Sequence, residues 1–388
     1  MVKKVFYVIL VFLLLSHRVL AYEAGSYKAA VLIEANSGRI LYEYNKDVQL
    51  PQASITKLMT YYVMKDLINK NNIDLNRAVK IDLSGIKMDP SWSQLGIKTG
   101  DEITLDNLIK SLLIVSANDS ALVLERLYNS PDFSGGSFIN AMNERAREIG
   151  MTKTRYVNST GLTDRINNKK YYNITSAYDT AILASDLLKK YPEIIEITKT
   201  KVFKYRGRDY ENWNRLLWNN PRVDGLKTGH TIEAGYCLVS TEDLTDLNGG
   251  GKPFRLVAVI LGAPSDSDRL NESIRLLKYG ENNFQNKVVV KKGDKFRLDS
   301  ELYKGGYVEG EASEDLYFVS AKDESIGKYV KFNERLPRKI RKGDVIGTVE
   351  IKNQRTGEVK ASNIYASGDF KQVSIFMRIF MFIRHLFD

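Results

Sequence analysis

The sequence contains very little histidine and cysteine for its length. Among its 388 residues there are three histidines and a single cysteine, Cys237. A structural zinc site normally uses four cysteine or histidine ligands, but only His230 and Cys237 lie away from the ends of the chain, so that class of site is excluded. An intramolecular disulfide is excluded too, because it needs two thiols. His17 and His385 lie near the two ends, so a Ser-His-Asp triad would have to use His230. We therefore expect any catalysis to rely on serine, lysine and carboxylates, with no metal or cofactor.

Long apolar runs are also scarce, and the one at the N-terminus is short. Lys3 and Lys4 precede the apolar run 5–15, and small residues follow at Val19-Leu20-Ala21. A membrane span needs roughly 20 apolar residues, whereas a basic start, a short apolar run and small residues are typical of a secretory signal. We predict a signal peptide over 1–21 and an exported protein. Its removal lowers the net charge from +10 to 54 − 47 = +7.

The C-terminal segment 371–388 has the pattern of an amphipathic helix. Lys371, Arg378 and His385 are seven residues apart and share one helical face. The opposite face carries Phe376, Ile379, Phe380, Ile383 and Phe387. We expect this helix to lie in a lipid interface, on the periplasmic or outer face of the cytoplasmic membrane. The alternative is a terminal helix docked on the core. The modestly basic body suits an anionic membrane or wall surface, whereas the dispersal of its charge and the predicted export argue against nucleic acid as a partner.

Residues 22–285 mix strand and helix patterns. Strands are expected at 29–34 and 39–44, joined by a tight turn, and again at 236–240 and 254–261. Helical patterns occupy about 54–69, 105–128, 136–149, 176–190 and 267–282. Strands at both ends of a helical middle predict an α+β fold, in which helices flank an antiparallel sheet and a helical cluster is inserted into it.

The pattern of the sequence changes at about residue 286, where the helical patterns end. Short strand patterns at 288–290, 316–319, 329–332 and 345–351 are separated by turns rich in glycine, lysine and aspartate. This pattern predicts a small β-rich domain over 286–370 without a reactive cluster of its own. We expect it to space the first domain from the terminal helix.

The first candidate site is Ser54-Ile-Thr-Lys57, at the start of the predicted helix 54–69. A serine and a lysine three residues apart share a helical face, and free N–H groups at the helix start lie beside the serine oxygen. Burial and a neighbouring cation would lower the pKa of the lysine, whose neutral amine could then take the serine proton. Ser84–Lys87 and Ser325–Lys328 have the same spacing. Taken alone, the motif therefore fits a capping serine and a surface lysine better.

Two further motifs follow. Ser116-Ala-Asn118 joins two apolar helical runs and could point a hydroxyl and an amide into a cleft, or could be an ordinary helix–helix turn. Lys227-Thr228-Gly229 precedes the strand at 236 and offers a cation, a hydroxyl and a position without a side chain, where a substrate backbone can lie close. Lys98-Thr99-Gly100 repeats the same three residue types, but its surroundings predict a turn. Cys237 lies among strand apolar residues, which favours a place in the core.

Together and in this order, the three motifs resemble those of the penicillin-interacting serine enzymes. The surrounding residues are most similar to the low-molecular-mass D-alanyl-D-alanine carboxypeptidases, which are penicillin-binding proteins with a β-lactamase/transpeptidase-like fold. The similarity extends to the segments 51–60, 116–121, 158–162 and 223–231, and it runs over nearly the whole mature chain. Trp213 departs from it, because some members have arginine there, so no substrate role is carried over to this position.

The resemblance implies a division of roles. Ser54 would attack the penultimate D-alanine carbonyl of a peptidoglycan stem peptide, and neutral Lys57 would accept its proton. Ser116, held by Lys227, would relay a proton to the departing D-alanine, and Asn118 would orient Lys57 and the substrate amide. Water would then release the acyl group. β-Lactams would acylate the same serine because they mimic the D-Ala-D-Ala end.

The resemblance also implies how the substrate is held. Backbone N–H groups of Ser54 and His230 would form an oxyanion hole, worth about 3–4 kcal/mol per donor in other hydrolases. Lys227 and Thr228 would bind the terminal carboxylate beside Gly229, with Arg269 as a second anchor. The His230 ring is left without an assigned role, since the residues alone favour a structural one over a catalytic base.

Three other interpretations stay open at this level. A class A β-lactamase would read Ser-Asp-Asn where this chain has Ser116-Ala-Asn118. A peptidoglycan endopeptidase needs the same catalytic groups and differs in what its cleft admits. A non-catalytic module that binds the wall or senses β-lactams would not need Ser54, Lys57 and Lys227 to be intact.

Overall fold

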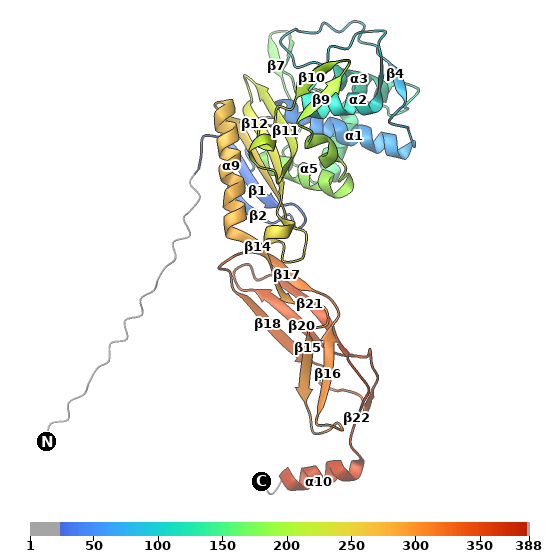
Figure 1. The fold of residues 1–388 in the computed structure, drawn as a ribbon, viewed down its shortest axis with the longest axis vertical. Helices are drawn as coiled ribbons and strands as arrows, with labels where there is room; N and C mark the ends of the chain where they lie inside the picture. The colour runs from blue at the N-terminus through green and yellow to red at the C-terminus, as the bar shows by residue number, and fades with distance from the viewer. Residues whose placement is uncertain (1–23, 386–388) are drawn as a thin grey trace, which may run out of the picture.

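The computed structural model describes residues 24–385, so the predicted signal peptide at 1–21 lies outside the described residues. Figure 1 shows the first domain at one end of an elongated molecule, the β-rich domain below it, and helix α10 at the far end. This linear order follows the chain, since no strand of the first sheet comes from beyond β13 among the described residues.

A five-stranded sheet organises the first domain in the order β11-β12-β13-β1-β2, and every neighbouring pair is antiparallel. The strands are β1 (Ala29–Glu34), β2 (Ile40–Tyr44), β11 (Val223–Thr231), β12 (Gly235–Asp243) and β13 (Arg255–Ala263). β1 is buried throughout because both faces of the sheet are covered. Alternate residues of a strand point to opposite faces. Accordingly, Val31 and Ile33 join the core on the α5 side, whereas Ala30 and Leu32 pack with the α9 leucines.

The helices agree with the predicted α+β class. They are α1 (Lys57–Lys70), α2 (Leu105–Lys110), α3 (Asn118–Asn129), α4 (Phe138–Glu148), α5 (Ala177–Lys190), α6 (Ile194–Thr198), α7 (Leu216–Asn219), α8 (Thr245–Asn248) and α9 (Asp266–Asn283). The helical pattern at 105–128 is interrupted by a π-helical turn at Ser111–Val115, which ends at Ser116, whose φ is +62°. This agrees with the expectation that Ser116-Ala-Asn118 joins two helical runs. Ser176 caps α5, since its Oγ accepts from the Asp179 N–H at 3.0 Å.

Four small hairpins and pairs surround the helical cluster. They are β3 (Leu50–Pro51) with β8 (Ile174–Thr175), β4 (Ala78–Lys80) with β5 (Glu102–Thr104), β6 (Asp164–Ile166) with β7 (Lys169–Tyr171), and β9 (Val202–Tyr205) with β10 (Arg208–Glu211). None of these strands was predicted from the sequence. They have two to four residues and are mostly exposed, so they carry too little alternation to be recognised.

The β-rich domain has its own five-stranded sheet and core. The sheet order is β15 (Lys295–Asp299), β16 (Tyr307–Ala312), β21 (Val359–Ala366), β20 (Val345–Asn353) and β18 (Ile326–Phe332). Two pairs flank it, β14 (Phe284–Val290) with β17 (Leu316–Ala321) and β19 (Lys339–Ile340) with β22 (Phe370–Lys371). β14 begins directly after α9, so the strands start two residues before the expected boundary at 286.

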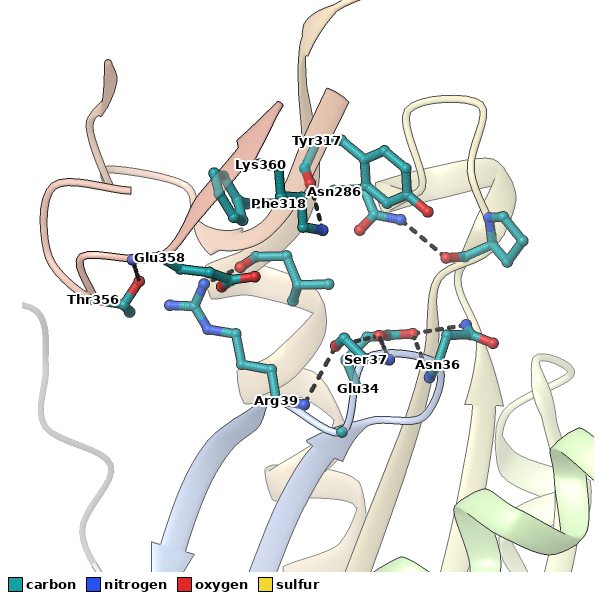
Figure 2. Close-up of a pocket in the computed structure, with 13 residues that line it drawn as sticks. Glu34, Asn36, Ser37, Arg39, Asn286, Tyr317, Phe318, Thr356, Glu358 and Lys360 are labelled. Atoms are coloured by element: carbon teal, nitrogen blue, oxygen red, sulfur yellow. Dashed lines mark hydrogen bonds between the residues drawn. The ribbon is translucent and has the colours of Figure 1, made fainter. Parts of the chain in front are cut away.

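The two domains meet at the turn between β1 and β2, where residues of both line a pocket of about 550 Å³. Figure 2 draws the residues that line it. Arg39 crosses the junction and forms an ion pair of 2.9 Å with Glu324. The Glu34 carboxylate accepts hydrogen bonds from Asn36 and Ser37 of the turn. Across the pocket, Lys360 donates to the Tyr317 carbonyl at 2.9 Å. Each of these charged groups has a hydrogen-bond or ion-pair partner within the protein, and the Arg39–Glu324 pair holds the two domains in contact at this junction.

The chain ends in the short helix α10 (Ile375–His385). It begins four residues after the expected start, because Lys371 belongs to β22 and pairs there with Lys339 of β19. Its described apolar side chains are exposed, and they include Ile375, Phe376, Met377, Ile379 and Ile383. Within residues 24–385, no helix has the length and apolar character to cross a membrane.

Candidate active site

Ser54 is the second residue of a short 3₁₀ turn, Ala53–Thr56, which leads directly into α1. Ala53 has a φ of +47°, a strained value for a residue with a side chain. A second segment packs against this turn at Gly161, where an added Cβ would lie 1.9 Å from the Ala53 carbonyl oxygen. The turn therefore fits only against a glycine, which explains Gly161 in the Asn-Ser-Thr-Gly segment.

Lys57 lies one turn below Ser54 and is completely buried. Its Nζ is 2.9 Å from Ser54 Oγ, 2.8 Å from Asn118 Oδ1 and 2.7 Å from the Thr160 carbonyl oxygen. Burial, followed by the repulsion of Lys227, lowers the Lys57 pKa well below its usual value. A neutral amine has two N–H groups, which satisfy Asn118 and Thr160, and one lone pair, which faces the Ser54 hydroxyl. The geometry thus provides a base within reach of a serine proton.

The Ser116–Asn118 turn comes from the break between the π-helical turn and α3. Ser116 is 6% exposed and faces the same cleft as Ser54. The Ser93 carbonyl accepts from both the backbone N–H and the Nδ2 of Asn118, at 2.8 and 3.1 Å. The buried Asp119 carboxylate accepts backbone N–H bonds from residues 95–97. The segment around Ser93 and the turn therefore hold each other in place.

Lys227, Thr228 and Gly229 lie on β11, the edge strand beside the Ser54 turn. An added Cβ on Gly229 would lie 2.9 Å from the Gln52 carbonyl oxygen and 3.1 Å from the Ser54 nitrogen. Only a residue without a side chain lets β11 approach the serine backbone this closely. Lys227 is 2% exposed, and its Nζ donates to the Thr228 carbonyl at 3.0 Å. Burial and then the charge of Arg269 lower the Lys227 pKa to about 7.

His230 and Arg269 form the outer wall on this side. The His230 ring stacks on Tyr236 at 4.0 Å between centroids, and burial followed by Arg269 lowers its pKa. The Arg269 guanidinium pairs with Asp266 and donates to the Gly229 carbonyl at 3.5 Å. It is 6% exposed, and it also donates to the Cys237 carbonyl at 3.4 Å.

A cleft of about 940 Å³ gathers most of the predicted site residues. Those that line it are Ser54, Ser116, Asn118, Thr228, Gly229, His230 and Arg269. Lys57 and Lys227 lie behind its wall, where burial lowers the pKa of both amines. Sequence reasoning missed the Thr160 carbonyl, Ser93 and the lining residue Trp213. The Thr160 carbonyl could have been suspected from the sequence, because Thr160 belongs to the segment 158–162 that carries the family resemblance.

The duplicate motifs lie elsewhere. Lys98-Thr99-Gly100 forms a turn, with the Asp101 N–H donating to the Lys98 carbonyl at 3.0 Å. Ser84 and Lys87 are both exposed, and the Ser325 motif runs into β18 of the second domain. Among residues 24–385, no group of three His, Cys, Asp or Glu side chains is placed to hold a metal ion. Cys237 is fully buried, as expected for a core thiol.

Comparison with known proteins gives a family and a fold. The family model described as D-alanyl-D-alanine carboxypeptidase matches residues 19–265. The chain is similar to the D-alanyl-D-alanine carboxypeptidase DacF of Bacillus subtilis, with 31% identity over 91% of this chain and 87% of the relative.

Solved structures agree with this result. Penicillin binding protein 5 from Haemophilus influenzae aligns with a TM-score of 0.66 and 26% identity, over 90% of this chain and 99% of that one. Penicillin-binding protein D2 from Listeria monocytogenes, solved in a cefotaxime-bound form, aligns with a TM-score of 0.57 and 30% identity, over 66% of this chain and 98% of that one. The expected β-lactamase/transpeptidase-like fold is thereby confirmed. With its family model, its full-length relative and its fold in agreement, the chain belongs to the D-alanyl-D-alanine carboxypeptidase family of serine peptidases.

Proposed function

We propose that this protein is a serine D-alanyl-D-alanine carboxypeptidase that removes the terminal D-alanine from peptidoglycan stem pentapeptides through an acyl-enzyme on Ser54. The observation that carries the proposal is the buried Lys57 amine, 2.9 Å from the Ser54 hydroxyl and lowered in pKa. An endopeptidase and a non-catalytic module are not favoured, because the family and the matched relative are both named carboxypeptidases.

In the acylation step, Lys57 takes the Ser54 proton as Oγ attacks the penultimate D-alanine carbonyl. General-base assistance of this kind contributes about 10²- to 10⁴-fold in rate. Asn118 keeps the Lys57 lone pair on the serine by accepting one of its N–H groups at 2.8 Å. The oxyanion forms beside the Ser54 and His230 backbone N–H groups, where the close approach of Gly229 brings β11 against the serine turn.

The leaving D-alanine needs a proton on its nitrogen and a partner for its carboxylate. Ser116 lines the same cleft as Ser54 and supplies the proton relay. Lys227 and Thr228 hold the carboxylate, and a bound anion favours the charged form of Lys227, whose pKa is about 7 in the free protein. Arg269 adds positive charge behind Gly229, since its guanidinium bonds to the Gly229 carbonyl. Water then attacks the acyl-enzyme and regenerates Ser54.

We further propose that the protein is exported and rests on the membrane surface through α10. Exposed Phe376, Ile379 and Ile383 give the helix an apolar surface that the rest of the protein leaves uncovered. At 11 residues the helix is too short to span a bilayer, so it would lie in the interface. A chain that ends after Phe370 should keep its activity but no longer sediment with anionic vesicles. Unchanged sedimentation would contradict the anchor.

The activity is tested by measuring free D-alanine released from a soluble pentapeptide that ends in D-Ala-D-Ala. The protein should release it, and Ser54→Ala should release none. Ser84→Ala is a matched control, because Ser84 begins the same Ser-x-x-Lys spacing at an exposed position. Equal release by the wild-type protein and Ser54→Ala would contradict the proposal, as would a loss of release in Ser84→Ala.

A further inference from the structure

Trp213 is a half-exposed indole on the wall of the cleft that holds Ser54 and Ser116. It is 51% exposed, yet its Nε1–H donates to the Val115 carbonyl at 3.2 Å. Val115 is the last residue of the π-helical turn and directly precedes Ser116. The indole therefore binds the peptide that leads into the Ser116 turn.

The backbone of Trp213 is fixed although its ring is exposed. The neighbouring Asn212 and Asn214 are both buried. Asn212 Nδ2 donates to the carbonyls of Thr198 and Thr200, at 3.1 and 3.0 Å, and Asn214 Nδ2 donates to the Gly225 carbonyl at 3.0 Å. These bonds tie the loop to α6 and to β11, so the indole is held from two elements outside the Ser116 turn.

The Ser116 turn needs such support. Ser116 has a φ of +62°, a left-handed conformation that costs energy for a residue with a side chain. The carbonyl before it accepts two bonds, from Ser93 Oγ at 2.5 Å and from Trp213 Nε1. Ser93 also fixes Asn118 on the other side of Ser116. Ser93 and Trp213 thus hold the same strained turn through one carbonyl oxygen.

We propose that Trp213 is a positioning residue for Ser116, acting through the Val115 carbonyl to hold the hydroxyl where it relays a proton to the leaving group. The inference rests on the role proposed for Ser116 and adds a residue outside the three motifs. The indole N–H makes the bond to the Val115 carbonyl. A phenylalanine at this position keeps an aromatic ring in the cleft wall but cannot make that bond.

The test is the rate at which a fluorescent penicillin acylates the protein, measured for Trp213→Phe alone and combined with Ser116→Ala. One neutral hydrogen bond corresponds to a slowing of about 3- to 10-fold. We expect this slowing in the Trp213→Phe protein and no further slowing when Ser116 is already alanine. The Michaelis constant for the pentapeptide should stay unchanged, because the ring wall is kept.

Trp218→Phe is the matched control. Trp218 is 41% exposed on α7 and contacts Arg215 and Lys201 through its ring face. Its replacement should leave acylation within twofold. Equal slowing by Trp213→Phe with and without Ser116 would overturn the proposal, and so would the absence of any slowing. A wild-type protein that takes no label would instead overturn the proposed function, and this inference with it.

Discussion

Replacing Gly229 with alanine tests how the edge strand is fitted to the nucleophile. The new Cβ would lie 2.9 Å from the Gln52 carbonyl oxygen and 3.1 Å from the nitrogens of Ser54 and Ile55. All three are backbone atoms, so the 3₁₀ turn itself must move by a few tenths of an ångström. Overpacking of this kind costs about 1–3 kcal/mol, of which the better strand propensity of alanine returns about 0.5 kcal/mol.

The same displacement should damage catalysis more than stability. Losing one oxyanion donor entirely costs about 10²- to 10³-fold, so a displaced but surviving Ser54 N–H should slow acylation by about 10- to 100-fold. Penicillin labelling measures the rate, and denaturant unfolding measures the stability.

Gly280→Ala provides the matched control for this experiment. Its Cβ would crowd Leu256 and Leu32 in the core on the α9 side. It should destabilise the fold without slowing acylation. The reasoning is refuted if Gly229→Ala acylates within twofold of the wild-type rate, or if Gly280→Ala slows acylation equally.

Three further predictions follow from burial and charge. Lys57→Arg should slow acylation at least 100-fold at every pH from 6 to 9, because arginine cannot supply a neutral base; activity that returns at high pH would contradict this. Lys227 must be charged to hold a carboxylate, and its pKa is about 7. Hence kcat/KM for the pentapeptide should fall as the pH rises above about 7, and Lys227→Gln should lower kcat/KM and abolish that fall. Burial raises the Cys237 pKa to about 11, so a thiol reagent at pH 8 should label it only after unfolding, as mass spectrometry would reveal.

The order of the three motifs was enough to predict the core of the site. Ser54, Lys57 and Asn118 meet within hydrogen-bond distance, although 61 positions separate Lys57 from Asn118 in the chain. The spacing alone could not choose between Ser54 and Ser84. The structure distinguishes them by burial, since Lys57 is fully enclosed whereas Lys87 is exposed.

What the sequence did not predict depends on the backbone and on distant contacts. The Thr160 carbonyl binds Lys57 through a main-chain atom that every residue type possesses. A break at Ser116 was predicted, but the sequence did not indicate that Ser93 and Trp213, from elsewhere in the chain, bind the Val115 carbonyl that precedes it. The start of α10 is set by the strand pairing of Lys371 in β22 with Lys339 in β19. Hydrophobic periodicity gives no indication of such a pairing.

In the proposed mechanism, Ser54 becomes the acyl carrier because buried Lys57 removes its proton. The most direct measurement is the mass of the protein after brief exposure to penicillin, followed by peptide mapping of the adduct. We predict one penicillin per chain, on the peptide that contains Ser54, and no adduct on Ser54→Ala. An adduct on Ser84 or Ser116, or the same rate of labelling in Lys57→Arg, would contradict the account.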